Sequence, residues 1–164
     1  MVNVGEVAPD FQLPLHTEEE FRLSACRGKK NVILYFYPSD AALGPKGEGP
    51  FAKQLEAIEA LDGYVVGING DDLETHQSFA RKFRLGFVLA SDERLEVCRN
   101  YRAVWMRGLG IRKITYIIDK RGVVRAKMHH ELLVDKHWES VLRILRELRD
   151  EEEVRTYNRK YMKL

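Results

Sequence analysis

A chain of 164 residues with 45% hydrophobic and 32% charged side chains is long enough to bury a full core and has a globular composition. Its 27 basic and 25 acidic residues give a net charge of +2, which argues against nucleic acid or an acidic membrane as a partner. With two cysteines and no run of about 18 apolar residues, we expect a cytoplasmic protein in a reducing compartment, with no membrane span.

The first elements in the chain are predicted to be a short edge hairpin and one buried strand. Residues 8–15 alternate apolar and polar side chains and include two prolines, and residues 21–23 supply a second short strand. A helical turn through Cys26 follows. The apolar run at 32–37 then predicts a central strand that is buried on both faces.

The loop after this central strand has the position of a functional site. A strand that runs through a loop into a helix is where α/β proteins place their chemistry, because backbone N–H groups and the helix dipole converge there. Residues 38–50 nevertheless contain no Cys, no His and no phosphate-binding motif. This loop therefore lies where a functional site is expected, but it lacks the usual reactive side chains.

The rest of the chain alternates helices and strands. The predicted elements are a helix at 51–61, a strand at 64–68, a helix at 73–83, a strand at 87–90, a helix at 91–101, a hairpin of strands at 114–119 and 123–128, and a helix at 137–148. A βαβ unit followed by a ββα unit predicts an α/β, thioredoxin-like fold, a mixed central sheet flanked by helices, with an N-terminal hairpin extension. We expect one domain over 1–149 and a charged, helical tail over 150–164, which extends the last helix or docks separately.

No group of polar residues in the sequence predicts a metal or a cofactor. His129 and His130 are neighbours on a strand and would point to opposite faces. Asp71 and Asp72 form an acidic pair in a loop with no further ligands near them in the sequence, and His76 is expected to face solvent from its helix. We therefore expect neither a metal nor a cofactor.

Several segments resemble peroxiredoxins in both order and spacing. They are Gly5-Glu6-Val7-Ala8-Pro9-Asp10-Phe11, the strand ending in Tyr37-Pro38, Phe87-Val88-Leu89-Ala90-Ser91-Asp92, the helix around Val97–Tyr101, and Gly110-Ile111-Arg112-Lys113-Ile114-Thr115-Tyr116-Ile117-Ile118-Asp119. The likeness runs from about residue 4 to about residue 148. It is closest to the bacterioferritin comigratory protein (peroxiredoxin Q) branch of the alkyl hydroperoxide reductase/thiol-specific antioxidant superfamily, and it implies a thioredoxin fold and a thiol peroxidase.

The motif of that family implies a site that this chain does not reproduce. In P-x-x-x-T-x-x-C the Cys thiolate attacks the O–O bond, the Thr orients the peroxide, and an Arg from a later strand stabilises the developing charge. Many members have a resolving Cys five residues after the first. Carried onto this chain, Pro38 keeps its identity, Ala42 replaces Thr, Pro45 and Pro50 replace the two Cys, and Lys113 replaces Arg.

These replacements also predict a change in local structure. Three glycines between residues 44 and 49 each cost a helix about 1 kcal/mol relative to Ala, and an interior proline costs about 3 kcal/mol. We expect the first helical turn of the family's site to be lost, with residues 43–49 as a loop and the helix beginning near Pro50. A milder alternative is an isolated turn that starts at Pro45.

Two candidate thiols remain. Cys98 lies in a helix whose face is expected to pack inward, where a free cysteine is normally an inert, small apolar residue. Cys26 is flanked by Arg27, Lys29 and Lys30, whose charge could lower the pKa of its thiol.

The sequence thus predicts a peroxiredoxin-like protein that has lost thiol peroxidase activity. It would act as a binding or regulatory module, as a monomer or a dimer, for a protein or small-molecule partner that the sequence does not identify. The alternative is a residual thiol oxidoreductase that uses Cys98 or Cys26.

Overall fold

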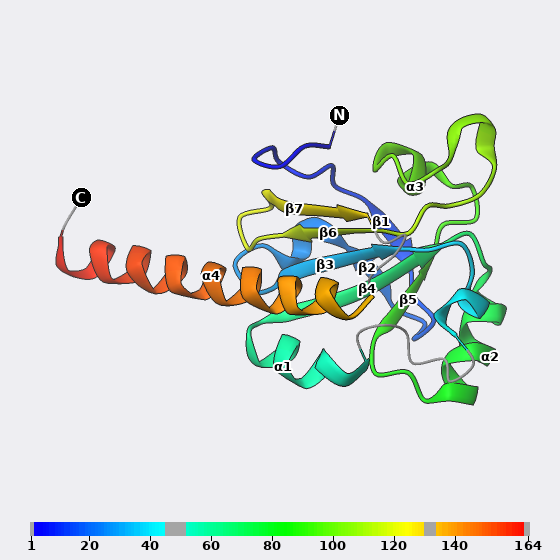
Figure 1. Ribbon diagram of the computed structural model, residues 1–164, viewed down its shortest axis with the longest axis horizontal. Helices are drawn as coiled ribbons and strands as arrows, with labels where there is room; N and C mark the ends of the chain where they lie inside the picture. Colours follow the sequence, from blue (N-terminus) through cyan, green and yellow to red (C-terminus); the bar gives the residue numbers. More distant parts are fainter. Residues whose placement is uncertain (1, 45–51, 130–133, 163–164) are drawn as a thin grey trace.

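The protein is built around a five-stranded mixed sheet (Figure 1). The computed structural model describes residues 2–44, 52–129 and 134–162. The strands are β1 Gln12–Pro14, β2 Glu20–Arg22, β3 Asn31–Phe36, β4 Gly63–Asn69, β5 Val88–Ser91, β6 Ile114–Ile118 and β7 Val124–His129. The α-helices are α1 Leu55–Ala60, α2 Leu73–Phe83, α3 Glu96–Asn100 and α4 Val134–Tyr161, and the 3₁₀ turns are η1 Leu23–Cys26, η2 Asp40–Leu43, η3 Ala52–Gln54 and η4 Met106–Gly108.

The strand order β5-β4-β3-β6-β7 places the most apolar strand at the centre of the sheet. All six residues of β3 are buried. The strand pairs in parallel with β4 and antiparallel with β6, β4 pairs in parallel with β5, and β6 and β7 form the predicted antiparallel hairpin. β1 and β2 form a separate antiparallel pair. The predicted thioredoxin-like fold with an N-terminal hairpin is therefore confirmed.

Alternate side chains of β3 enter two hydrophobic cores, one on each face of the sheet. Val32, Leu34 and Phe36 lie in the core shared with the β1–β2 hairpin and α3. Ile33 and Tyr35 lie in the core covered by α1 and α4. This division follows from the two-residue period of a strand, which directs neighbouring side chains to opposite faces. Figure 1 shows α1 and α4 together on one side of the sheet.

The third helix is shorter than the sequence predicts. Leu95 has a left-handed backbone (φ 56°), so the helix begins at Glu96 rather than directly after Ser91. Asp92 still acts at its start, because one carboxylate oxygen accepts a hydrogen bond from the backbone N–H of Cys98 at 2.8 Å. The helix therefore occupies only the second half of the predicted range.

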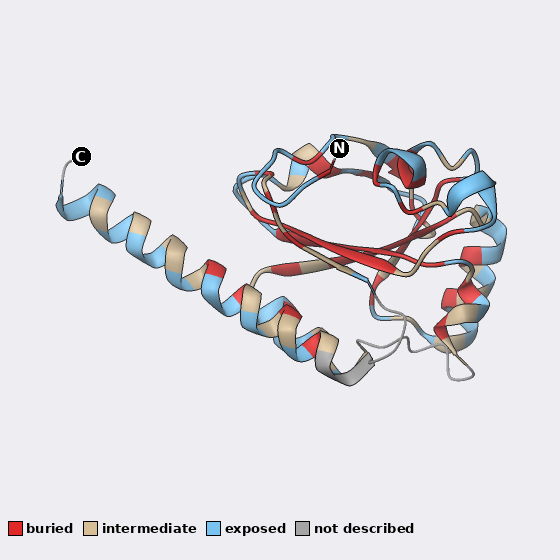
Figure 2. Cartoon of the chain, turned by 45° about the horizontal axis from the view of Figure 1, so that its top comes forward, coloured by how far each residue is buried: buried red, intermediate tan, exposed pale blue. Residues whose placement is uncertain are grey.

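The last helix, α4, spans 28 residues and includes residues 150–161 of the segment predicted as a charged tail. Its first half packs on the sheet through Trp138, Val141, Leu145 and Leu148, all buried. Its second half extends beyond the sheet (Figure 2). Over the described residues, no helix is both long and apolar enough to cross a membrane.

Candidate functional site

The candidate site lies where the parallel strands β3 and β4 end. Tyr37 follows β3 and leads into the turn η2, which begins at Asp40. Asn69 is the last residue of β4, and Asp71 follows it just before α2. Because β3 and β4 run in the same direction, their carboxyl ends bring these two connections side by side.

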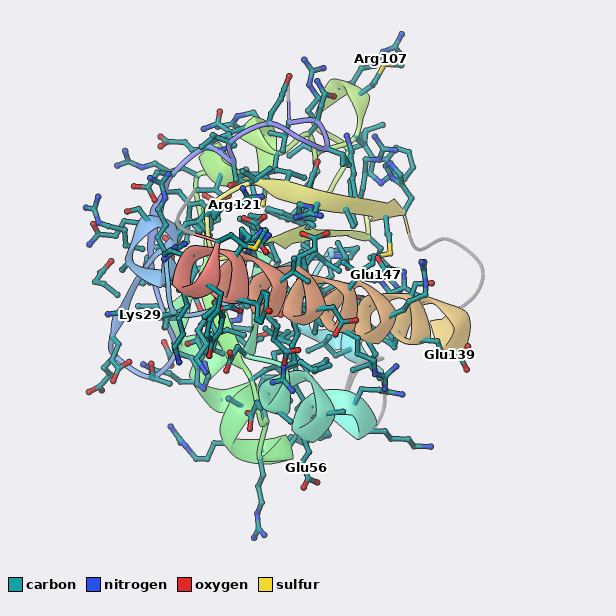
Figure 3. The ribbon with its side chains drawn as sticks, turned by 90° about the vertical axis from the view of Figure 1, so that its left-hand side faces the viewer. Lys29, Glu56, Arg107, Arg121, Glu139 and Glu147 are labelled. Carbon is teal, nitrogen blue, oxygen red and sulfur yellow. The ribbon has the colours of Figure 1, made fainter. Side chains whose placement is uncertain are left out.

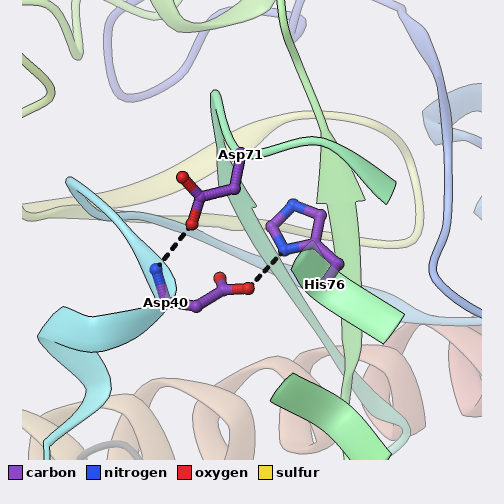
Figure 4. A group of neighbouring side chains, drawn as sticks. All are labelled: Asp40, Asp71 and His76. Atoms are coloured by element: carbon purple, nitrogen blue, oxygen red, sulfur yellow. Dashed lines mark hydrogen bonds and ion pairs between the residues drawn. The ribbon is translucent and has the colours of Figure 1, made fainter. Parts of the chain in front are cut away.

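Buried Asp40 is the centre of a hydrogen-bonded network at this edge. Tyr37 donates its hydroxyl proton to Oδ1 at 2.7 Å, and the Asn69 side-chain amide donates to the same oxygen at 3.0 Å. The Nδ1 atom of His76 lies 2.6 Å from Oδ2. The backbone N–H of Asp40 donates to Asp71 at 2.9 Å. Figure 4 shows the contacts of Asp40 with Asp71 and His76.

The helix α2 brings His76 into the network. Asp72 caps the helix by accepting a hydrogen bond from the N–H of Thr75, and the N–H of His76 donates to the Asp72 carbonyl. This cap fixes the first turn, so that His76 and, one turn later, Ala80 point inward. His76 is fully buried, which corrects the expectation that it faces solvent. Phe79 and Phe83 are only half-buried.

Burial and hydrogen bonding act in opposite directions on the Asp40 carboxyl. Burial alone raises its pKa, but the hydrogen bond and charge of His76, with the hydrogen bonds from Tyr37 and Asn69, outweigh this effect, and the pKa is lowered. The pKa of Tyr37 is raised well above its ordinary value, mainly by burial and to a smaller extent by the negative charge of Asp40. Tyr37 is thus held as a neutral donor beside an ionised carboxylate.

The network also brings together three groups that could act as metal ligands. One ligand atom each from Asp40, Asp71 and His76 lies within 4.8 Å of the others, which corrects the expectation that Asp71 has no ligands near it. Asp40 and His76 are already hydrogen-bonded to each other, and Asp71 accepts from the Asp40 backbone. A cation would therefore have to displace these bonds. The Nε2 atom of His76 is buried without a partner among the described residues.

A cavity of about 960 Å³ opens beside the network, between η2 and α2. Asp40 and Asp71 lie in its wall, together with the half-buried rings of Phe79 and Phe83. Lys82 lines it further along α2. The lining thus combines apolar rings with carboxylates and one ammonium group, a mixture typical of binding sites for small molecules.

The positions carried over from the peroxiredoxin motif lie at the same end of the sheet, as far as they are described. Pro38 is exposed two residues after the end of β3, and Ala42 is half-buried in η2. Lys113 precedes β6, one step beyond the Phe36–Ile114 pair, which places it opposite the residue after β3. Pro45 and Pro50, and with them most of the predicted loop, lie outside the described residues. Gly44, which ends η2, has φ 94°.

Neither cysteine lies in the connection that follows β3. Cys98 is fully buried in the core on the α3 face, and burial, reinforced by Asp92, raises the pKa of its thiol strongly. Cys26 is half-buried in η1, before the start of β3. Burial raises the pKa of Cys26 and outweighs the opposite effect of Lys29 and Lys30, so these basic neighbours do not lower the pKa of its thiol.

Comparison with known proteins places this chain in a family. Residues 4–127 match the family described as "AhpC/TSA family". The chain is 34% identical over 149 residues to a chloroplastic peroxiredoxin Q of Populus jackii, covering 90% of this chain and 70% of that protein. It is 35% identical over 149 residues to a chloroplastic peroxiredoxin Q of Triticum aestivum, covering 90% and 68%.

Solved structures agree with this assignment. The crystal structure of peroxidoxin BcpB from Mycobacterium tuberculosis is similar with a TM-score of 0.77 and 26% identity, covering 89% of this chain and 97% of that one. The family match covers well over half of the sequence, and the thioredoxin-like sheet described above is the fold that these relatives share. The chain therefore belongs to the AhpC/TSA family of peroxiredoxins.

Proposed function

We propose that this family member works as a binding module rather than as a thiol peroxidase. The observation that carries the proposal is the placement of its two cysteines, neither of which lies at the end of β3 where the family resemblance puts the reacting thiol. A peroxidatic cysteine needs a thiolate at neutral pH and access to the peroxide. Each cysteine of this chain lacks at least one of these properties.

Cys98 lacks both properties. Its side chain has no exposed surface, and its thiol pKa is raised by burial and by the adjacent Asp92 carboxylate. A thiol in such surroundings stays protonated and cannot reach a peroxide in solution. The backbone N–H of Cys98 donates to Asp92, which fixes the start of α3 and favours a structural role.

Cys26 is more accessible but lies at the wrong end of the sheet. Cys26 precedes β3, whereas Pro38 lies beyond the other end of this strand. A strand of six residues spans about 20 Å, which separates the thiol from the candidate site by about this length. The raised pKa of Cys26 also argues against a thiolate at neutral pH. A reaction at this thiol would therefore use none of the groups at the candidate site.

The cavity beside Asp40 supports the binding part of the proposal. Its wall offers the rings of Phe79 and Phe83 for apolar contact, and the carboxylate of Asp71 and the ammonium of Lys82 for charge recognition. The described lining contains no thiol, the group that a peroxidase of this family would use. We infer that a partner molecule is held here without covalent chemistry.

A peroxidase assay tests the absence of thiol chemistry. We expect purified protein to reduce hydrogen peroxide with dithiothreitol no faster than free thiol does, and both cysteines to resist alkylation at pH 7. Cys26→Ser and Cys98→Ser are the matched controls. Peroxidase activity well above the free-thiol rate that one of these substitutions abolished would establish the alternative, a residual thiol oxidoreductase.

A thermal-shift screen tests the binding part separately. Small organic cations and anions with an apolar group are the probes, and Phe79→Asp is the control, because a carboxylate in the cavity wall opposes apolar contact. We expect hits that raise the Tm of the wild-type protein but not that of the variant. Hits that stabilise both proteins equally would show binding outside this cavity.

A further inference from the structure

We infer that the projecting half of α4 is a dimerisation surface that pairs antiparallel with α4 of a second copy of this chain. Four large apolar side chains near the end of the helix are more than half exposed, namely Val154, Tyr157, Tyr161 and Met162 at 57–59%. The rings of Tyr157 and Tyr161 lie 4.7 Å apart and form one continuous surface. Figures 1 and 2 show this part of the helix projecting past the sheet.

The exposed stripe lies on a different face of α4 from the side chains that pack on the sheet. Leu148 is the last buried apolar residue of the packed face. Val154 follows six residues later, which turns a helix of 3.6 residues per turn by roughly 240° beyond Leu148. The exposed residues thus do not continue the packing on this chain's own core. They form a second apolar face directed away from it.

Polar contacts hold α4 to the domain up to the point where the second face begins. Arg125 on β7 forms two hydrogen bonds with Glu151, at 2.7 and 2.8 Å. Lys120 bridges Glu152 and Asp62, with 2.8 Å to each carboxylate. These contacts fix the direction of the helix as it leaves the sheet. Short helices are marginal in water without tertiary packing, so a partner on the second face would stabilise the remaining turns.

The spacing of the apolar residues is that of a helix pair. Val154, Tyr157 and Tyr161 are separated by three and four residues, which corresponds to positions a, d and a of a heptad. A hollow of about 410 Å³ along the helix lies beside them, between Tyr157, Tyr161 and the charged side chains of Glu153 and Lys160. Knobs from a facing helix pack into such hollows.

The charges beside the stripe select a second copy in antiparallel orientation. Glu153 and Lys160 are seven residues apart and both occupy position g. In an antiparallel pair, g faces g of the partner, so Glu153 of each copy meets Lys160 of the other. In a parallel pair Glu153 would face the uncharged Asn158. Both side chains are exposed, and neither forms an ion pair within the described part of the chain.

Sedimentation of the full-length protein over about two decades of concentration tests this inference. We expect a reversible monomer–dimer equilibrium. By symmetry the dimer contains two Glu153–Lys160 pairs, so Glu153→Lys and Lys160→Glu each turn both attractions into repulsions and should raise the dissociation constant about tenfold. Glu56→Lys makes the same change in net charge as Glu153→Lys, but on α1, where the Glu56 side chain points into solvent (Figure 3). This control should leave the equilibrium unchanged.

Two combinations of these substitutions test the orientation. The double variant Glu153→Lys/Lys160→Glu restores both pairs and should recover the wild-type dissociation constant. An equal mixture of the two single variants should form mixed dimers, since each supplies the charge that the other has lost. Tyr157→Ala removes apolar contact without changing charge and should also weaken the dimer.

Three results would overturn the inference. The first is a wild-type protein that stays monomeric at every concentration. The second is a dimer that the charge reversals and Tyr157→Ala leave unchanged, which would place the interface elsewhere. The third is a monomer that binds vesicles of anionic phosphatidylglycerol through the aromatic and basic residues of α4, since this would assign the surface to a membrane. Far-UV circular dichroism of each variant shows whether its helices are intact.

Discussion

Replacing Asp40 by Ala should destabilise the protein more than any other single change at the candidate site. The carboxylate accepts hydrogen bonds from Tyr37 and Asn69 and pairs with fully buried His76. Alanine leaves all three groups without this partner. A buried polar group that loses its partner costs about 1–3 kcal/mol, and breaking a buried charged pair costs about 3–5 kcal/mol.

The cavity beside Asp40 moderates this loss. Because Asp40 lies in the cavity wall, water can enter and solvate part of the network once the carboxylate is gone. We therefore expect the free energy of unfolding to fall by about 3–5 kcal/mol rather than by the sum of three orphaned groups. Single domains are stable by only about 5–15 kcal/mol, so this is a large fraction of the total.

Urea denaturation followed by circular dichroism measures this loss. Ser78→Ala is the control, because Ser78 is an exposed residue of α2 that lines the same cavity, and its change should stay within about 0.5 kcal/mol. Asp40→Asn keeps the shape of the side chain and should cost less than Asp40→Ala. Equal stabilities of Asp40→Ala and Ser78→Ala would refute the view that this network holds the two connections together.

The sign of the pH dependence provides a second measurement on the same variants. The pKa of Asp40 is lowered in the folded protein, so the folded state binds its proton less readily than the unfolded chain does. The stabilisation is therefore present above the ordinary Asp pKa of about 4 and is lost as the pH falls below it. Asp40→Asn should remove this part of the acid sensitivity.

Two further changes probe the packing around the sheet. Burial lowers the pKa of His137 to about 4 from an ordinary 6.5. The free energy of unfolding should therefore fall by up to about 3 kcal/mol as the pH falls from 6.5 to 4. In a profile of unfolding free energy against pH, His137→Gln should flatten this part. Gly63→Ala would place a methyl group 2.5 Å from the Ile58 side chain and 2.8 Å from the Ile58 carbonyl oxygen. Urea denaturation should therefore show that the free energy of unfolding falls by about 1–3 kcal/mol. An unchanged midpoint would contradict this close approach.

The strands were predictable because their signals are local and strong. The run at 32–37 is apolar at every position, and only a central strand buries both faces in this way. The hairpin of β6 and β7 follows from two apolar segments joined by a turn at Gly122, whose φ is 81°. These patterns, with the family resemblance, were sufficient for the thioredoxin-like fold.

The network at the site was not predictable from the same patterns. Asp40 and His76 are 36 residues apart in the sequence, and their contact depends on how β3 pairs with β4. Apolar periodicity normally marks the inward face of a helix, and in the helix at 73–83 Phe79 and Phe83 carry that signal although both are only half-buried. A buried histidine on that face carries no apolar signal. The available clue was the position of Asn69 at the end of β4 and of Asp40 in the turn that follows β3, because both are polar residues close to the carboxyl ends of buried strands.

Under the proposed function, the same network stabilises this end of the sheet without a reactive thiol. Asp40 is held by Tyr37, Asn69 and His76, and none of these residues is a position where the chain departs from the peroxiredoxin motif. The replaced position Ala42 lies in η2, where its N–H donates to the Ser39 carbonyl, a bond that needs no particular side chain. Stability at this edge and thiol chemistry therefore depend on different residues. Of the motif positions that the structure describes, none lines the cavity between η2 and α2, so the walls of this cavity do not depend on them.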